Sequence, residues 1–196
     1  MDARFSANAG PTLQTLSMKL LPALALLFAV TRLAAADLPG LKVGDAAPDF
    51  TLPSSSGESQ SLQALLAHGP TVLVFVRSAD WCPFCRRQLQ DLQKSLPAIE
   101  ATGVRLIALS YDAPATNAAA AAKLGLTFPL LSDVGSKVID AYGIRNHEAT
   151  GRGAGIPHPT VFLVDRQGVI LAKLGRDGYK ERPEAAEIMA AAKALP

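Results

Sequence analysis

Trp81-Cys82-Pro83-Phe84-Cys85 is the most informative segment of this chain. It contains the only two cysteines and the only tryptophan among 196 residues. The apolar run at 71–76 before it is typical of a buried strand, and leucines with helical spacing follow it, at positions 89, 92 and 96. The two thiols are therefore predicted to lie where a central strand passes into a helix.

This position suits thiol chemistry. Cys82 is expected at the helix N-terminus, where unpaired backbone N–H groups favour an anion and lower the pKa of a cysteine below its usual value of about 8.5. Pro83 fits the first helical turn because its missing N–H is not needed there. Cys85 lies on the same face, within disulfide reach but further inside the helix. We predict that Cys82 attacks a substrate disulfide and that Cys85 resolves the mixed disulfide.

Two other uses of the cysteine pair are less favoured by the sequence. A purely structural disulfide would close a very small ring, which stabilises a fold by about 2 kcal/mol against roughly 3 for a fifteen-residue loop. A zinc site normally needs four nitrogen or sulfur ligands, and the three histidines, at 68, 147 and 158, lack ligand spacing to the pair. We therefore predict no bound metal.

Cations follow the second cysteine directly. Arg86 and Arg87 would stand in the first helical turn, where positive charge opposes the helix dipole. Either they favour a thiolate or attract an anionic partner, or they are a solvated surface pair. The sequence leaves both interpretations open, and we take Arg86 as a supporting site residue.

The composition excludes several functions. The net charge is +2 without a basic block, so nucleic acid is not an expected partner. The chain has no glycine-rich motif for a flavin, a nicotinamide or a phosphate, so no cofactor is expected. Electrons must then come from an external thiol reductant, or pass to an external oxidant.

Residues 1–36 resemble an N-terminal extension with a secretory signal peptide. Lys19 precedes an apolar run at 20–30, and an Ala-x-Ala exit ends at Ala36, where we predict cleavage. Met18 is a hypothetical true start, since a complete signal begins there. The protein is therefore expected to be exported, periplasmic or secreted, and an uncleaved membrane tether is the alternative.

The remaining chain alternates strands and helices. The predicted strands are short ones near Phe50 and at 128–131 and longer ones at 71–76, 104–110, 160–165 and 169–174. The predicted helices begin after Ser61, after the cysteine motif (to about Leu96, with Pro97 ending or kinking it), at Pro114, at 136 with Asp133 as a cap, and after Pro183. This order implies one domain, 41–196, with a mixed central sheet flanked by helices.

At this point the chain resembles the thioredoxin fold. Trp81–Cys85 is similar to the Trp-Cys-x-x-Cys of thioredoxins, with a dipeptide close to that of glutaredoxins. The segment 156–165 is similar to the strand that begins with a cis-proline in that fold, and Pro159 takes this place. The resemblance implies that Pro159 packs against the active-site disulfide. His158 beside it is our candidate for tuning the pair, since the buried acid of thioredoxins falls at Val76 here.

More narrowly, the segment 44–52 is similar to the opening of the redoxin branch, the alkyl hydroperoxide reductase/thiol-specific antioxidant group. An extra helix and strand between 113 and 142 also fit that branch. The resemblance therefore implies an α/β thioredoxin-like fold with the helix–strand insertion of the redoxins. Its partners would be protein or small-molecule thiols and disulfides, or peroxides.

The branch implies a second function, a peroxiredoxin-like thiol peroxidase. Aligning the peroxiredoxin loop places Cys85 at the peroxide-attacking cysteine, Cys82 at the Thr/Ser position and Ser78 at the proline. The peroxiredoxin arginine falls at Pro159, which leaves Arg77 or Arg86 as substitutes. We therefore favour a thiol–disulfide oxidoreductase, with the peroxidase as the alternative. A non-catalytic binding or metal-delivery module is a third hypothesis.

Overall fold

The computed structural model describes residues 38–195, and the predicted signal segment lies outside this range. Within it, the elements are β1 (Thr51–Pro53), β2 (Ser59–Ser61), α1 (Leu62–Ala67), β3 (Thr71–Phe75), α2 (Pro83–Glu100), β4 (Arg105–Ser110), α3 (Pro114–Leu124), β5 (Leu130–Ser132), α4 (Lys137–Ala141), β6 (Thr160–Val164), β7 (Ile170–Gly175) and α5 (Ala185–Lys193). No helix in this part of the chain is long and apolar enough to cross a membrane.

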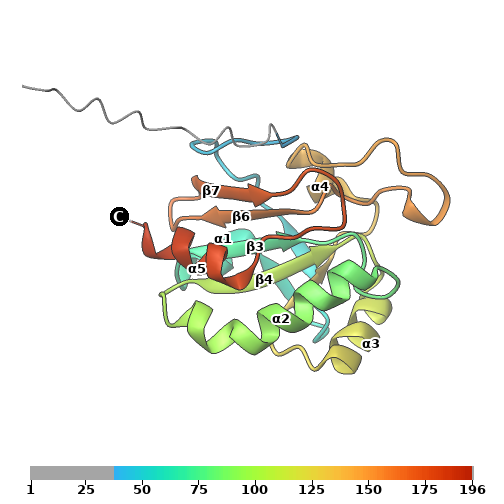
Figure 1. The fold of residues 1–196 in the computed structure, drawn as a ribbon, viewed down its shortest axis with the longest axis horizontal. Coiled ribbons are helices and arrows are strands. Elements are labelled where there is room, and N and C mark those ends of the chain that lie inside the picture. The colour runs from blue at the N-terminus through green and yellow to red at the C-terminus, as the bar shows by residue number, and fades with distance from the viewer. Residues whose placement is uncertain (1–37, 196) are drawn as a thin grey trace, which may run out of the picture. The chain divides into compact units, whose positions relative to one another are not determined.

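A five-stranded mixed sheet forms the centre, with strand order β5-β4-β3-β6-β7 (Figure 1). β3, β4 and β5 are parallel, and β6 and β7 are antiparallel to their neighbours. Because side chains alternate along a strand, β3 supplies both cores. Val72 and Val74 pack with α2, α3 and α5, whereas Leu73 and Phe75 pack with α1 and α4. The predicted mixed sheet covered on both faces is confirmed.

The predicted insertion between 113 and 142 is also confirmed. α3 begins at Pro114 and ends at Gly125, which adopts the left-handed conformation that glycine tolerates best (φ 66°). β5 then adds to the edge of β4. The carboxylate of Asp133 accepts the backbone N–H groups of Val138 and Ile139, so it caps α4 as predicted.

The predicted end of the active-site helix was wrong. α2 continues through Pro97 to Glu100. Proline removes one helical hydrogen bond there, but Leu96 and Ile99 on either side are buried in the core. Their burial holds the last turn in helical form.

Candidate functional site

The two cysteines are joined in a disulfide at the N-terminus of α2, with their Cα atoms 5.3 Å apart. Cys82 is the N-cap residue, in an extended conformation, and its Sγ accepts the backbone N–H of Cys85 at 3.3 Å. Pro83 occupies the first helical position, as predicted. The sulfur of Cys82 therefore takes the place that a serine or aspartate oxygen takes in an ordinary N-cap.

Cys85 lies further inside the helix than Cys82, as predicted, and neither cysteine is exposed in this disulfide state. Cys82 and Cys85 are both 0% exposed and belong to the core on the α2 side of the sheet. Trp81 and Phe84 are partly buried and pack against this core. A reaction partner can therefore reach the sulfur atoms only after groups around the disulfide move.

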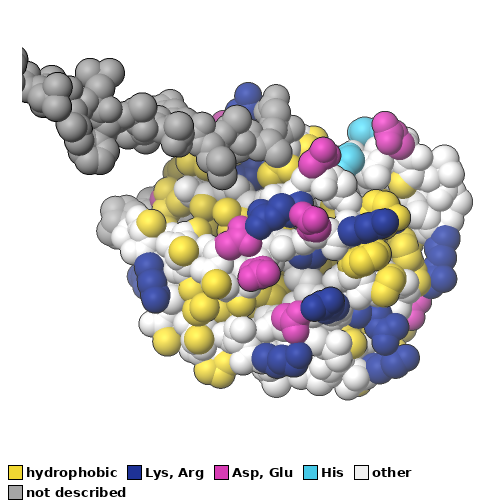
Figure 2. Space-filling view, viewed as in Figure 1, with side chains coloured by type: hydrophobic (Ala, Val, Ile, Leu, Met, Phe, Trp, Pro, Cys, Tyr) yellow, Lys and Arg dark blue, Asp and Glu magenta, His cyan; other side chains and the backbone are white. Residues whose placement is uncertain are grey.

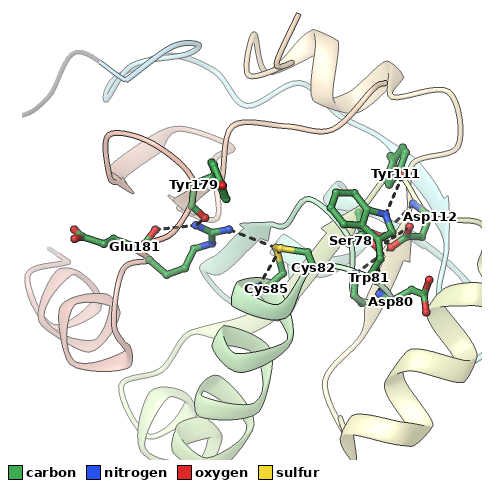
Figure 3. Close-up of a disulfide and its surroundings, with 12 residues drawn as sticks. Ser78, Asp80, Trp81, Cys82, Cys85, Tyr111, Asp112, Tyr179 and Glu181 are labelled. Atoms are coloured by element: carbon green, nitrogen blue, oxygen red, sulfur yellow. Dashed lines mark hydrogen bonds between the residues drawn. A yellow bond between two sulfur atoms is a disulfide. The ribbon is translucent and has the colours of Figure 1, made fainter. Parts of the chain in front are cut away.

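One flank of the disulfide is held by a buried carboxylate (Figure 3). Asp112 follows β4 and accepts hydrogen bonds from the Ser78 hydroxyl, the Ala79 N–H and the Ser110 hydroxyl, each at 3.0 Å. The Ser78 hydroxyl oxygen accepts the N–H groups of Asp80 and Trp81 in turn. Burial raises the pKa of Asp112, although these hydrogen bonds oppose the shift. The network fixes the turn that presents the cysteine motif.

Trp81 is tied to the long loop between α4 and β6. Its indole N–H donates to the Tyr111 hydroxyl (3.1 Å), which donates to the carbonyl of Arg152 in that loop (2.5 Å). The Arg152 guanidinium pairs with Asp80 at 2.8 Å and lies 5.3 Å from the Trp81 ring. The Trp81 indole N–H and the Arg152 guanidinium thus both have polar partners, and Trp81 is fixed beside the disulfide. We use the name Trp81 flank for this set of residues, which consists of Ser78, Asp80, Trp81, Tyr111, Asp112 and Arg152.

The opposite flank carries a guanidinium group against the second sulfur. Arg182 lies just before α5, and its Nη2 atom is 3.5 Å from Cys85 Sγ. Its Nη1 atom donates to the backbone carbonyls of Tyr179 and Glu181, two residues that lie across the disulfide from Trp81 in Figure 3. We call Arg77, Tyr179 and Arg182 the Arg182 flank.

Arg77 connects the two flanks. Its guanidinium carbon lies 5.2 Å from the Trp81 ring and 4.5 Å from the Tyr179 ring, and the Tyr179 ring packs edge-on against Phe84. Burial, together with the positive charge of Arg77, lowers the pKa of Arg182 to about 10. Two like charges therefore lie close together at the disulfide.

The prediction of a cis bond before Pro159 was wrong. Pro159 is buried at the start of β6, but no peptide bond between residues 38 and 195 is cis. The trans form is the favoured isomer, and with it the backbone groups of His158 have hydrogen-bond partners. The N–H of His158 donates to the Ile144 carbonyl, and the Thr160 hydroxyl donates to the His158 carbonyl.

Two other predicted supporting residues line cavities that neither cysteine lines. His158 lines a cavity of about 350 Å³ with His147 and Glu148, and none of the residues of the cysteine motif lines it. Burial lowers the pKa of His158. Arg86 lines a different cavity with Asp80 and residues of α3. No group of three potential ligands for a metal ion occurs in the described part of the chain.

Sequence reasoning missed Arg182 and Asp112. The sequence places Arg182 97 positions after Cys85, between a turn and Pro183, where an arginine is unremarkable. Asp112 follows a strand without a motif around it. Arg77 was considered as a peroxidase residue, and the structure places it beside Trp81 and Tyr179 rather than in contact with a sulfur.

Comparisons with known proteins agree with this fold and motif. The model of the AhpC/TSA family matches residues 43–173. The protein named alkyl hydroperoxide reductase E from Mycobacterium tuberculosis is 36% identical over 132 residues, covering 66% of this chain and 82% of that protein. The protein named thiol-disulfide oxidoreductase ResA from Geobacillus thermodenitrificans is 29% identical over 148 residues, with 72% and 76% covered.

Solved structures give the same fold. The peroxidoxin BcpB from M. tuberculosis superposes with a TM-score of 0.70 and 25% identity, over 80% of this chain and 99% of that one. A peroxiredoxin-like protein from Aquifex aeolicus reaches 0.69 at 22% identity, over 79% and 88%. The predicted thioredoxin-like fold of the redoxin branch is confirmed.

Proposed function

Since this chain belongs to the AhpC/TSA family and is a thiol-dependent oxidoreductase, we propose that it is an exported thiol–disulfide oxidoreductase. The Cys82 thiolate attacks one sulfur of a substrate disulfide and releases the first thiol. The Cys85 thiolate then attacks Cys82 Sγ and releases the second thiol. The substrate gains two electrons and the protein is left as the Cys82–Cys85 disulfide.

The placement of Cys82 is the observation that supports this proposal. Its sulfur caps α2 and accepts the N–H of Cys85, and a helix N-terminus stabilises a thiolate there. Cys85 lies within bonding distance of Cys82, so the resolving step needs no large rearrangement of the backbone. An external thiol reductant then supplies two electrons and returns the Cys82–Cys85 disulfide to the dithiol.

A thiol peroxidase is the second candidate, and Arg182 is the observation that favours it. The peroxidase reaction would have Cys85 attack a peroxide oxygen, releasing water or an alcohol and leaving a sulfenic acid that Cys82 converts to the disulfide. Such a step needs a donor aimed at the reacting oxygen. Arg182 supplies a guanidinium 3.5 Å from Cys85 Sγ, although Pro159 occupies the position expected for an arginine.

Single-cysteine variants distinguish the two candidates. For the oxidoreductase, Cys82→Ser abolishes reduction of 2-hydroxyethyl disulfide, whereas Cys85→Ser accumulates a mixed disulfide that mass spectrometry detects. For the peroxidase, Cys85→Ser is the inactive variant in stopped-flow consumption of hydrogen peroxide. A peroxide rate of the reduced wild type no greater than that of free cysteine excludes the second candidate.

Export is the further part of the proposal, and it is supported by the sequence of residues 1–36 alone. The expected mature protein begins at Asp37 and is recovered from the periplasm or the medium. Mass spectrometry of the protein from its natural cell tests this, because peptides from positions 1–36 in the mature product contradict cleavage. Peptides from positions 2–17 in the precursor contradict a start at Met18.

A further inference from the structure

A cleft lies between α2 and the segment that leads into α5, next to the Arg182 flank. Its volume is about 480 Å³, and its lining includes Phe84, Gln88, Leu92, Arg182 and Pro183. Figure 1 shows α2 and α5 side by side on this face of the sheet. Pockets of roughly 300–1,000 Å³ are typical of sites for small molecules. Phe84 and Arg182 connect the cleft with the disulfide.

The two edges of the Arg182 guanidinium have different surroundings. The Nη1 atom is anchored by the carbonyls of Tyr179 and Glu181. The Nη2 atom approaches Cys85 Sγ, and the Nε atom is buried without an acceptor in the described part of the protein. An Nε–Nη2 edge is the fork that binds a carboxylate through two parallel hydrogen bonds. Arg182 therefore has two donors on this edge, Nη2 beside the Cys85 sulfur and the buried Nε, that no oxygen atom of residues 38–195 accepts.

The positive charge at this fork has no carboxylate to neutralise it. Neither Arg182 nor Arg77 forms an ion pair with any residue between 38 and 195. The Arg77 Nε atom is also buried without an acceptor. Partly buried guanidinium groups with free donors are costly unless an anion satisfies them.

The acidic residues that line the cleft do not supply that anion. Asp91 is engaged by Arg87 and Lys94 on the surface of α2, and Glu184 is the N-cap residue of α5. Basic and acidic side chains alternate across the face shown in Figure 2, without one large basic patch. The positive charges of Arg182, of Arg77 and of Lys180, which also lines the cleft, therefore remain without an ion pair among residues 38–195.

Gln88 adds an independent sign of a ligand. It lies one turn after Cys85 on α2 and is 6% exposed, and its Oε1 atom has no hydrogen-bond partner among the described residues. Phe84, Leu92 and Pro183 give the cleft an apolar wall. A small molecule with a carboxylate, a short carbon chain and a hydrogen-bonding group fits these features.

We propose that this cleft is a subsite for a carboxylate-bearing small thiol or disulfide, with its carboxylate on the Nε–Nη2 edge of Arg182. The subsite rests on the proposed function for its use in turnover. It makes anionic low-molecular-weight disulfides preferred substrates over neutral or cationic ones. The reacting sulfur of such a substrate lies one short carbon chain away from the carboxylate, at the Cys82–Cys85 pair.

The site is tested without turnover by alkylation of a single thiol. The Cys82→Ser protein keeps only Cys85, whose thiolate displaces iodide from either iodoacetate or iodoacetamide. The two reagents have similar size and differ in charge, so the ratio of their rates reports an anion site. Changes in thiolate fraction affect both rates equally and cancel in the ratio.

We expect Arg182→Gln in the Cys82→Ser background to lower the iodoacetate-to-iodoacetamide ratio about tenfold, because a bidentate charged contact is lost. Arg182→Lys keeps the charge but loses the fork, and gives an intermediate ratio. The matched control is Arg166→Gln in the same background. Arg166 is exposed in the β6–β7 turn, and its replacement by glutamine removes the same net charge. The ratio for this control variant therefore stays at the parent value.

An Arg182→Gln ratio equal to that of the parent overturns the subsite. If that variant does not fold, the parent protein decides the question. Salt screens an interaction between charges, so a parent ratio that does not fall with added sodium chloride also overturns the subsite. Exchange with 3,3′-dithiodipropionate and with 2-hydroxyethyl disulfide then separates the two proposals. If the alkylation preference is intact but neither disulfide is exchanged, the oxidoreductase is contradicted and the anion site is retained. If both disulfides are exchanged equally, the substrate preference is contradicted.

Discussion

The two flanks of the disulfide differ in how completely their polar groups are hydrogen-bonded. On the Trp81 flank, Asp112 accepts three hydrogen bonds. The Trp81 indole N–H donates to the Tyr111 hydroxyl, which donates to the Arg152 carbonyl. On the Arg182 flank, two guanidinium groups lie close together without a carboxylate, and each has a buried Nε atom without an acceptor within residues 38–195. The first arrangement stabilises the folded protein, and the second is complete only when an anion is present.

This difference separates structural from reactive groups around one bond. A satisfied polar network rigidifies the segment that carries it. An unsatisfied cation beside a sulfur atom instead favours a thiolate or an anionic substrate. Changes on the Trp81 flank should therefore alter stability first, and changes on the Arg182 flank should alter reactivity first.

The largest expected effect on stability is at Asp112. Asp112→Ala removes the acceptor of three buried donors and should lower the free energy of unfolding by about 3 kcal/mol. Urea denaturation of the oxidised protein measures it. Asp91→Ala is the control, because its surface ion pairs with Arg87 and Lys94 contribute less than about 0.5 kcal/mol. Equal losses for both variants contradict the comparison.

The same carboxyl has a pH signature. Because burial raises the pKa of Asp112, the folded state binds its proton more tightly than the unfolded state does. The stability of the wild type relative to Asp112→Asn should therefore fall as the pH rises above the unfolded value of about 3.9, and become constant above the raised folded value. A difference that rises with pH contradicts this direction.

A smaller effect is expected at the Tyr111 hydroxyl. Tyr111→Phe removes the acceptor of the Trp81 indole and the donor to Arg152, and should cost about 1 kcal/mol. Hydrogen exchange in the loop 143–158 should accelerate, and the emission of the single tryptophan should shift. Tyr179→Phe is the matched control, since no hydrogen bond of its hydroxyl occurs within the described chain. Unchanged hydrogen exchange of the loop in Tyr111→Phe contradicts a role of the Tyr111 hydroxyl in holding this loop.

The smallest effect on stability is expected at Arg182. Arg182→Gln should change the free energy of unfolding by less than about 0.5 kcal/mol, because it also removes a like charge beside Arg77. Arg176→Gln, which breaks the ion pair with Glu187 (2.5 Å), should cost about 1 kcal/mol. Thermal or urea unfolding measures both. A loss at Arg182 larger than at Arg176 means that the Arg182 flank is structural.

Most of the fold could be predicted from local patterns. The buried strand at β3, the cap at Ser61, the end of α3 at Gly125 and the hairpin after β6 follow from apolar runs, turn residues and proline positions. The end of α2 could not, because the core contact of Ile99 outweighs one lost hydrogen bond at Pro97. The trans bond at Pro159 could not either, since both isomers are compatible with the sequence.

By itself, the sequence determined where the two cysteines lie and predicted that the chemistry takes place there, because two cysteines three residues apart at a helix start have few other uses. Only the tertiary structure decided what surrounds them. The contacts of Asp112 with Ser78, of Tyr111 with Trp81 and of Arg182 with Cys85 join residues that are 34, 30 and 97 positions apart. Local patterns encode the strand and helix that hold a residue, whereas the packing of distant segments determines which charges lie next to a sulfur atom.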